Sequence, residues 1–87
     1  MGNSRSIETK STYTIKEVNE HNKRYPNSIW LMANKRVYDV TEMISYHPGG
    51  RDILFSKIGK DCTKDYLFHS KEGRKLWVKY CIGYLQG

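Results

Sequence analysis

Residues 35–50 read KRVYDVTEMISYHPGG, and most of the structural prediction depends on them. Polar and apolar residues alternate from Arg36 to Val40, as expected of the return strand of a hairpin. Asp39 or Thr41 can then cap a short helix that has an acidic residue in its first turn. The sequence therefore predicts a strand followed directly by a helix that contains Met43, Ile44 and Tyr46.

This helix must end near His47, because Pro48 disfavours a helical conformation in the residue before it. Gly49 and Gly50 allow the backbone to turn sharply behind the histidine. Such a turn leaves a carbonyl able to accept a hydrogen bond from one ring nitrogen of the imidazole. A bond of this kind fixes the tautomer of a histidine and strengthens it as a metal ligand. From the residues alone, His47 is either a simple turn residue or a ligand.

Further strand patterns flank this stretch on both sides. Ser28 to Ala33 is strongly apolar and Asn34-Lys35 is typical of a hairpin turn, so a strand is expected to pair with the one that follows. Tyr13 to Ile15 and Ile82 to Leu85 suit short strands near the two ends. One or two helical turns are expected from Lys16 to Asn22.

Three more short helices are predicted before the last strand, and Gly59 ends the first of them. Their expected ranges are Arg51–Lys57, Asp61–Phe68 and Lys71–Tyr80. In the third helix, Leu76, Trp77 and Tyr80 are expected to face inward. The predicted fold class is α+β. Short helices in series rarely pack a continuous core by themselves, so we expect another group to be wedged among them.

The length and composition are those of one small globular domain. The chain has 87 residues, of which 38% are hydrophobic and 28% charged, and this balance argues against disorder. Residues 1–11 are polar and have no periodicity, so we expect a flexible N-terminal arm before a domain at 12–87. The apolar runs are too short for a transmembrane helix, and the polar start predicts no secretory signal peptide.

The two cysteines and the charge narrow the function classes. Cys62 and Cys81 form no C-x-x-C motif, which argues against a disulfide framework, a structural zinc site and covalent haem attachment. Fifteen Lys and Arg against nine Asp and Glu give a net charge of +6, which favours an acidic partner or an anionic membrane. No nucleic-acid partner is expected, because the basic residues form no long run and belong to no binding motif.

A second histidine, His69, follows His47 at the end of a predicted helix. The two helices between them can form a hairpin that brings the two imidazoles face to face across a flat group. Taken alone, His69 would be interpreted as a surface residue. The pair is a stronger signal, because apolar residues flank it at Leu54, Ile58, Leu67 and Phe68.

From Tyr13 to Leu85 the sequence resembles the cytochrome b5 domains. The resemblance is carried by Tyr13–Asn22, Trp30-Leu31, Lys35–Thr41, His47-Pro-Gly-Gly50, Gly59-Lys-Asp61 with Thr63, His69-Ser70 and Ile82-Gly83. The His-Pro-Gly-Gly motif preceded by Val-Tyr-Asp-Val-Thr is its most specific part. It implies a small mixed sheet beneath short helix pairs that form a haem crevice.

The resemblance also implies the cofactor and its site. The cofactor would be haem b (iron protoporphyrin IX), bound non-covalently, with His47 and His69 as the two iron ligands. Ser70 matches a serine that bonds a haem propionate. The remaining candidate haem contacts are apolar or aromatic: Met43, Ile53, Leu54, Ile58, Tyr66 and Phe68.

An iron with both axial positions filled by protein leaves no site for oxygen or substrate, so the implied task is one-electron transfer. We expect an electron carrier rather than an enzyme, since no nucleophile–base pair or paired carboxylates occupy a plausible pocket. Electrons would pass from a flavin-dependent reductase to an acceptor protein. Two alternatives are a non-redox module that binds haem or a small ligand, and an electron-port domain cut from a larger oxidoreductase.

Two features depart from familiar members of the family. The spacing between the two histidines is a couple of residues shorter, and the missing residues fall just before His69. The charges near the haem edge are partly reversed in sign, at Arg51, Asp52, Lys57, Lys60, Lys64, Asp65 and Lys71. These charges are either a plain solvated face or a docking surface for partners with an acidic surface, and the usual partner set is not carried over.

The N-terminus raises the question of membrane contact. Met1-Gly2-Asn3-Ser4-Arg5-Ser6 fits the myristoylation pattern M-G-x-x-x-[ST]. One acyl chain binds membranes only marginally, so the basic surface would have to supply a second signal. We expect a monomer in the cytoplasm or at the cytoplasmic face of a membrane.

Overall fold

A computed structural model of the chain describes residues 11–45 and 51–86. These residues build a four-stranded mixed sheet with the order β1-β4-β3-β2. The strands are β1 (Ser11–Tyr13), β2 (Trp30–Ala33), β3 (Arg36–Asp39) and β4 (Cys81–Leu85). Strand β1 runs parallel to β4, whereas the β2–β3 and β3–β4 pairs are antiparallel. The last strand is thus central in the sheet, and the α+β class is confirmed.

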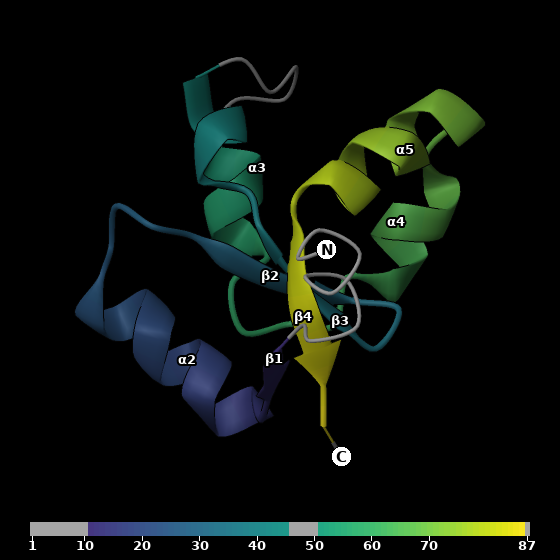
Figure 1. The fold of residues 1–87 in the computed structure, drawn as a ribbon. Helices are drawn as coiled ribbons and strands as arrows, with labels where there is room; N and C mark the ends of the chain where they lie inside the picture. Colours follow the sequence, from purple (N-terminus) through teal and green to yellow (C-terminus); the bar gives the residue numbers. More distant parts are fainter. Residues whose placement is uncertain (1–10, 46–50, 87) are drawn as a thin grey trace, which may run out of the picture.

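Helices cover both sides of this sheet. In Figure 1, α2 lies on one side, while α3 and the α4–α5 pair rise from the other. The helices are α2 (Ile15–Arg24), the 3-10 helix η1 (Thr41–Ser45), α3 (Arg51–Ser56), α4 (Thr63–Phe68) and α5 (Lys71–Lys79). Among the described residues, none of the helices has the length and apolar character that crossing a membrane requires.

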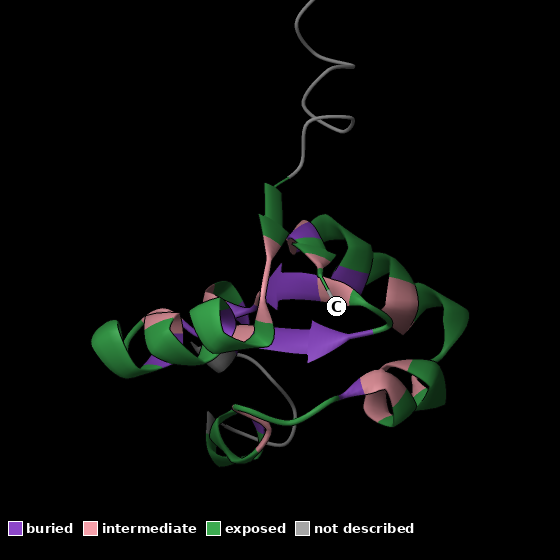
Figure 2. Ribbon diagram, turned by 90° about the horizontal axis from the view of Figure 1, so that it is seen from below, coloured by how far each residue is buried: buried purple, intermediate pink, exposed green. Residues whose placement is uncertain are grey.

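The β2–β3 hairpin closes through the predicted turn. Asn34 and Lys35 have φ values of 51° and 58°, as the two-residue type I′ turn requires. The expected return strand forms as β3, and its neighbouring residues Val37 and Tyr38 are both buried. Side chains therefore pack on both faces of the central strands. Figure 2 shows this burial concentrated on the sheet, with the helices exposed along their outer sides.

Each face of the sheet has its own core. On the face of α2, Val18, Met32 and Val37 are buried together. On the other face, a larger cluster joins β2 and β3 to the helices that follow; it contains Ile29, Leu31, Ala33, Tyr38, Val40, Met43, Leu54, Cys62, Trp77 and Tyr80. Successive residues of β2 therefore point into different cores, as a strand dictates.

The N-terminal elements begin earlier than predicted. The strand spans Ser11 to Tyr13, and Thr14 is the N-cap of α2 rather than part of a strand. The Thr14 hydroxyl accepts from the Glu17 amide at 3.0 Å, and the Glu17 carboxylate accepts from the Thr14 amide at 2.8 Å. This capping box is sufficient to start the helix at Ile15. The predicted arm, apart from residue 11, lies outside the described residues.

Two Asp-x-Thr turns attach the helices of the larger core to the ends of β2. Asp39 Oδ1 accepts hydrogen bonds from the amide and hydroxyl of Thr41, and Asp61 Oδ1 accepts the same pair from Thr63. Each threonine Oγ1 also accepts from a backbone amide beside β2. Thr41 takes the Ile29 amide at 3.0 Å and Thr63 takes an amide in the hairpin turn at 2.7 Å. The starts of η1 and α4 are fixed in this way.

Candidate functional site

A crevice of about 250 Å³ lies between the helices on the larger core. Strand β2 forms its floor, and α3, α4 and α5 contribute its walls. Its lining residues are Leu31, Ile53, Leu54, Lys57, Cys62, Asp65, Phe68, His69 and Trp77. Two larger hollows on the described surface, of about 330 and 460 Å³, contain no histidine. The crevice is therefore where an imidazole and an apolar surface meet.

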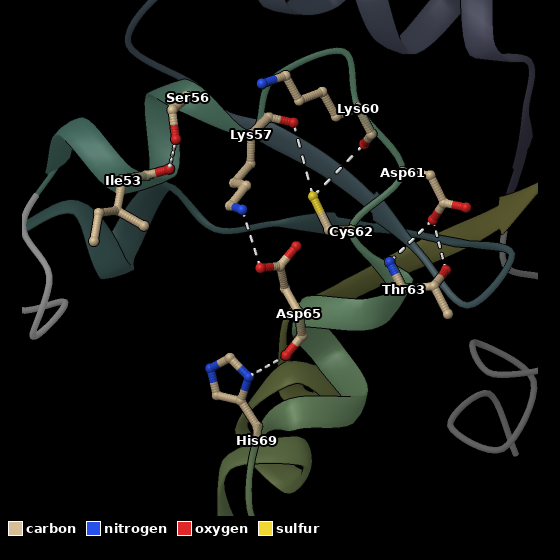
Figure 3. Close-up of polar contacts among 9 residues, drawn as sticks. All are labelled: Ile53, Ser56, Lys57, Lys60, Asp61, Cys62, Thr63, Asp65 and His69. Carbon is tan, nitrogen blue, oxygen red and sulfur yellow. Dashed lines mark hydrogen bonds and ion pairs between the residues drawn. The ribbon is translucent and has the colours of Figure 1, made fainter.

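His69 is held in one tautomer at the end of α4. Its Nδ1 lies 2.6 Å from the backbone oxygen of Asp65, four residues earlier (Figure 3). A carbonyl can only accept a hydrogen bond, so Nδ1 must carry the proton. The lone pair is then on Nε2, on the far side of the ring from Asp65. This is the arrangement of a metal-ligating histidine whose other nitrogen is bonded to the backbone.

The imidazole is also enclosed by α5, which begins two residues later. A Cβ built on Gly73 would lie 3.1 Å from the His69 Cβ and 3.3 Å from its Cδ2, so the helix backbone approaches the ring closely. The Trp77 ring packs against the imidazole edge-to-face, with centroids 5.6 Å apart and an interplanar angle of 72°. The Arg74 guanidinium donates to the His69 carbonyl oxygen at 3.2 Å. His69 is thus oriented by contacts on several sides.

Apolar side chains near His69 are left in contact with water. Phe68 is 92% exposed and Leu67 is 58% exposed, although both belong to α4. Ile53, on the opposite wall, is 44% exposed. Fully burying one such side chain stabilises by about 1.5–3 kcal/mol. A flat apolar ligand that covered them would therefore bind with a substantial hydrophobic contribution.

Of the polar groups that line the crevice, Lys57 and Asp65 form an ion pair and the Cys62 thiol is neutral. Lys57 Nζ lies 3.0 Å from Asp65 Oδ1, and this ion pair is partly exposed. Burial raises the pKa of the Cys62 thiol to about 11, and Asp65 adds to the effect. The Cys62 Sγ donates to the carbonyl oxygens of Lys57 and Lys60 (Figure 3). A thiol that stays protonated at neutral pH is a poor metal ligand, which leaves His69 as the ligand of this wall.

A buried donor on the crevice wall has no partner. Trp77 is only 6% exposed, and its Nε1 makes no hydrogen bond within the described part of the chain. A buried N–H that lacks an acceptor costs about 1–3 kcal/mol. Such groups in native proteins often occur where a further molecule completes the site.

Comparison with known proteins identifies the family. The model of the cytochrome b5-like heme/steroid binding domain matches residues 14–86. The chain belongs to this family. It is 41% identical over 73 residues to a cytochrome b5 of Cuscuta reflexa, covering 82% of this chain and 53% of that protein. It is 40% identical to a nitrate reductase [NADH] of Cucurbita maxima over 76 residues, which are 86% of this chain and 8% of that protein.

Solved structures of the family have the same fold. Cytochrome b558 of Ectothiorhodospira vacuolata, a prokaryotic homologue of cytochrome b5, superimposes with a TM-score of 0.73 at 28% identity, covering 88% of this chain and 100% of that one. The cytochrome b5 of Ostreococcus tauri virus 2 gives a TM-score of 0.69 at 25% identity, over 85% and 83% of the chains. These solved chains are covered over most of their length, whereas the chain spans about half the length of the Cuscuta cytochrome b5.

The residues of the crevice fit the cofactor of this family, non-covalent haem b. His69 offers Nε2 in the ligating tautomer, two apolar walls face each other, and Trp77, whose N–H has no partner among the described residues, lines the same crevice. The domain is therefore a cytochrome b5-like haem-binding domain of an electron-transfer family. His69 and the lining residues of α3 and α4 would hold the haem.

The structure places the predicted site residues in three groups. Ile53, Leu54, Phe68 and His69 line the crevice. Met43, Ile58 and Tyr66 belong to the larger core instead, and the Tyr66 ring packs on Trp77 with centroids 5.4 Å apart. Ser70 is the N-cap of α5, where its Oγ accepts from the Gly73 amide at 3.1 Å. His47 lies outside the described residues, and the haem contacts of all these residues stay predictions.

Several lining residues were not predicted from the sequence. Leu31 and Cys62 reach the crevice because the larger core continues into its floor. Trp77 was expected to face inward and does so, but Leu76 was expected beside it and is 49% exposed. The expectation for Leu76 was wrong, since the core packs against the Trp77 side of α5. Leu76 is 100° around the helix from Trp77, at the edge of this buried side, where half of it stays exposed.

Proposed function

We propose that this domain carries single electrons, with His47 and His69 as the two axial ligands of a haem b iron. The carrying observation is the Nδ1–H···O=C bond from His69 to Asp65, which leaves Nε2 as the ligating atom in an apolar crevice. Haem supplies a one-electron redox couple when it is bound. Two protein ligands leave no open position on the iron, which favours electron transfer over oxygen or substrate chemistry.

The chain's own residues would then have three tasks. The Asp65 carbonyl, Gly73 and Trp77 hold the His69 ring in one orientation, so little rearrangement accompanies the gain or loss of an electron. Ile53, Leu54 and Phe68 exclude water from the crevice. A dry, weakly polar site is one of the factors that set the reduction potential of a haem.

An absorption spectrum of the haem-loaded protein, before and after dithionite, tests the ligation. A sharp reduced Soret band with resolved α and β bands is expected of low-spin iron with two histidine ligands. His47→Ala and His69→Ala should each lose most of the haem or become high-spin. The matched control is His21→Ala, because His21 stacks on Trp30 at 3.6 Å and bonds Ser28, away from the crevice.

Three results would contradict the proposal. If both variants kept the wild-type spectrum, the ligand assignment would be wrong. A broad high-spin spectrum that shifts with carbon monoxide would mean an open iron site. If the wild-type protein took up no haem, a module that binds another small apolar ligand in the same crevice would be the better interpretation.

We further infer that a flavin-dependent reductase supplies the electron and that an acceptor protein receives it. This follows from the chemistry of a carrier that has no substrate site of its own. Stopped-flow reduction of the ferric domain by a flavin reductase and NADH would test the first step. Reduction no faster than by NADH alone would rule out that class of donor.

A second arrangement, as an electron port in a larger oxidoreductase, is supported by one observation. The nitrate reductase of Cucurbita maxima contains a segment 40% identical to this chain, and that segment is a small part of the enzyme. The size of the native polypeptide on an immunoblot would discriminate the two. A product much larger than 10.2 kDa would favour the port.

A further inference from the structure

Helix α5 presents two chemically different sides. Its inner side carries Trp77, and the following Tyr80 packs into the same core; both are nearly buried. Lys71, Lys75 and Lys79 recur every four residues, so they lie along one stripe of the helix. All three are exposed, and the Lys79 ammonium also lies 5.7 Å from the centroid of the Tyr80 ring. We call this stripe the lysine face.

The lysine face carries an excess of positive charge, although Lys79 also borders a hollow that is lined by Asp39 and Glu42. The nine residues of α5 contain four basic side chains and one acidic one, Glu72. Within the described residues, the ion pair found joins Lys57 to Asp65, at the crevice, and none involves the lysine face. The chain as a whole carries +6, so its own field adds to this local charge.

This face is close to the proposed iron ligand. Arg74 of α5 donates to the carbonyl oxygen of His69 at 3.2 Å, and Trp77 of the same helix packs on the His69 ring. A Cβ added at Gly73 would lie only 3.3 Å from the Cδ2 of that ring, so the helix packs closely beside it. A partner seated on the lysine face would be separated from His69 by roughly one helix diameter, about 10 Å. Electron transfer through α5 would need no rearrangement of the domain.

The chemistry of the face fits a protein better than a membrane. A helix that lies in a membrane surface turns a wide apolar side to the lipid. The side of α5 that carries Trp77 is already buried against the domain, and the exposed large apolar residues of the helix are Leu76 at 49% and Val78 at 62%. These two lie on opposite flanks of the lysine stripe and form no continuous apolar side. A solvated row of ammonium groups between separate apolar side chains instead matches an acidic patch on a folded partner.

We propose that the lysine face of α5 is the docking surface for an acidic electron-transfer protein. This rests on the proposed function, because it concerns the partner of the same haem site. The charges would steer the encounter and set its salt dependence, whereas Val78 would supply a small apolar contact. The partner is thus defined by carboxylates presented at the spacing of one α-helical face.

The test compares two triple variants with equal changes in charge. Lys71→Glu/Lys75→Glu/Lys79→Glu reverses the lysine face. Lys16→Glu/Lys23→Glu/Arg24→Glu is the matched control, since these residues are exposed on α2, on the other side of the sheet. Binding of fluorescein-labelled poly-L-glutamate is measured by anisotropy at low and at physiological salt. Amide shifts in the NMR spectrum locate the contact on the wild-type protein.

The α5 variant should weaken binding at least about tenfold and the α2 control much less, with shifts centred on residues 71–79. Equal weakening by both variants would overturn the proposal, because net charge alone would then explain the binding. Tighter binding to phosphatidylserine vesicles than to poly-L-glutamate, lost in the α5 variant, would overturn it in favour of a membrane. The neutral variant Lys71→Gln/Lys75→Gln/Lys79→Gln repeats the test if the Glu variant unfolds. The haem spectrum distinguishes failure of the docking proposal from failure of the proposed haem ligation, since loss of docking leaves the spectrum unchanged.

Discussion

Gly73→Ala tests how the backbone of α5 positions the iron ligand. The new Cβ would lie 3.1 Å from the Cβ and 3.3 Å from the Cδ2 of His69. Carbon atoms in ordinary contact are about 3.5–4.0 Å apart, so the imidazole would have to move by a few tenths of an ångström. That movement would disturb the 2.6 Å contact between His69 Nδ1 and the Asp65 oxygen.

The energies predict a selective defect. Alanine in place of glycine within a helix stabilises by about 0.5–1 kcal/mol. Overpacking against His69 costs about 1–3 kcal/mol, and the half-buried ring can relieve part of it. The fold should therefore lose no more than about 2 kcal/mol. Disturbing the groups that orient a ligand typically lowers metal affinity about 10–100-fold, so haem loss should accelerate by at least about tenfold.

Transfer of haem to excess apomyoglobin measures the rate of loss, and urea unfolding followed by circular dichroism measures stability. Electron paramagnetic resonance of the ferric protein reports a change in ligand orientation that a general loss of stability would not produce. Leu76→Ala is the control, because Leu76 is on the same helix but 49% exposed. Wild-type haem loss together with an unchanged resonance spectrum would refute the role assigned to Gly73.

Three further predictions concern the scaffold. Asn22→Ala removes two 2.8 Å hydrogen bonds, to the amide and the carbonyl of Trp30, and should cost about 2–4 kcal/mol in urea unfolding; a loss below about 1 kcal/mol would contradict it. Thr63→Val removes the acceptor of a turn amide and the hydroxyl bonded to Asp61, and should lower Tm by roughly 4–8 °C. The pKa of Cys62 is raised to about 11 from an ordinary 9.0, so the folded state keeps a proton that the unfolded chain releases. The free energy of unfolding should fall from pH 9 to 11 more steeply than in Cys62→Ala; parallel urea profiles would contradict this.

The elements that the sequence predicts well are those with strong local signals. The Asn34-Lys35 turn forms as expected, because few two-residue sequences tolerate two positive φ values. The start of α2 was misplaced although Thr14 and Glu17 have the spacing of a capping box, a signal that the prediction overlooked. The exposure pattern of β3 could not be predicted from alternation. It depends on α2 and the later helices covering opposite faces of the sheet, which is a tertiary property.

The candidate site was also only partly predictable from the sequence. The sequence motif points to His69 as a ligand, but the Asp65 carbonyl that fixes its tautomer is a backbone group with no sequence signature. The sequence argued against a zinc site at Cys62, but it did not predict that this residue lines the crevice or that burial raises the pKa of its thiol. Leu76 and Trp77 are both apolar and are adjacent in the sequence, so their residue types did not show which of the two is buried.

Helix α5 takes part in both the proposed haem site and the proposed docking surface. Its residue Gly73 has no side chain, and a Cβ there would lie only 3.3 Å from the Cδ2 of the His69 ring, so the glycine allows the helix to pack closely on the imidazole. Trp77 then fills the space beside the ring, while Lys75 is exposed on the opposite side. Since the helix is a rigid unit of nine residues, a partner docked on the lysine face would take a fixed orientation relative to the ligand. The same close packing that orients the imidazole thus determines how near an acidic partner can come to it.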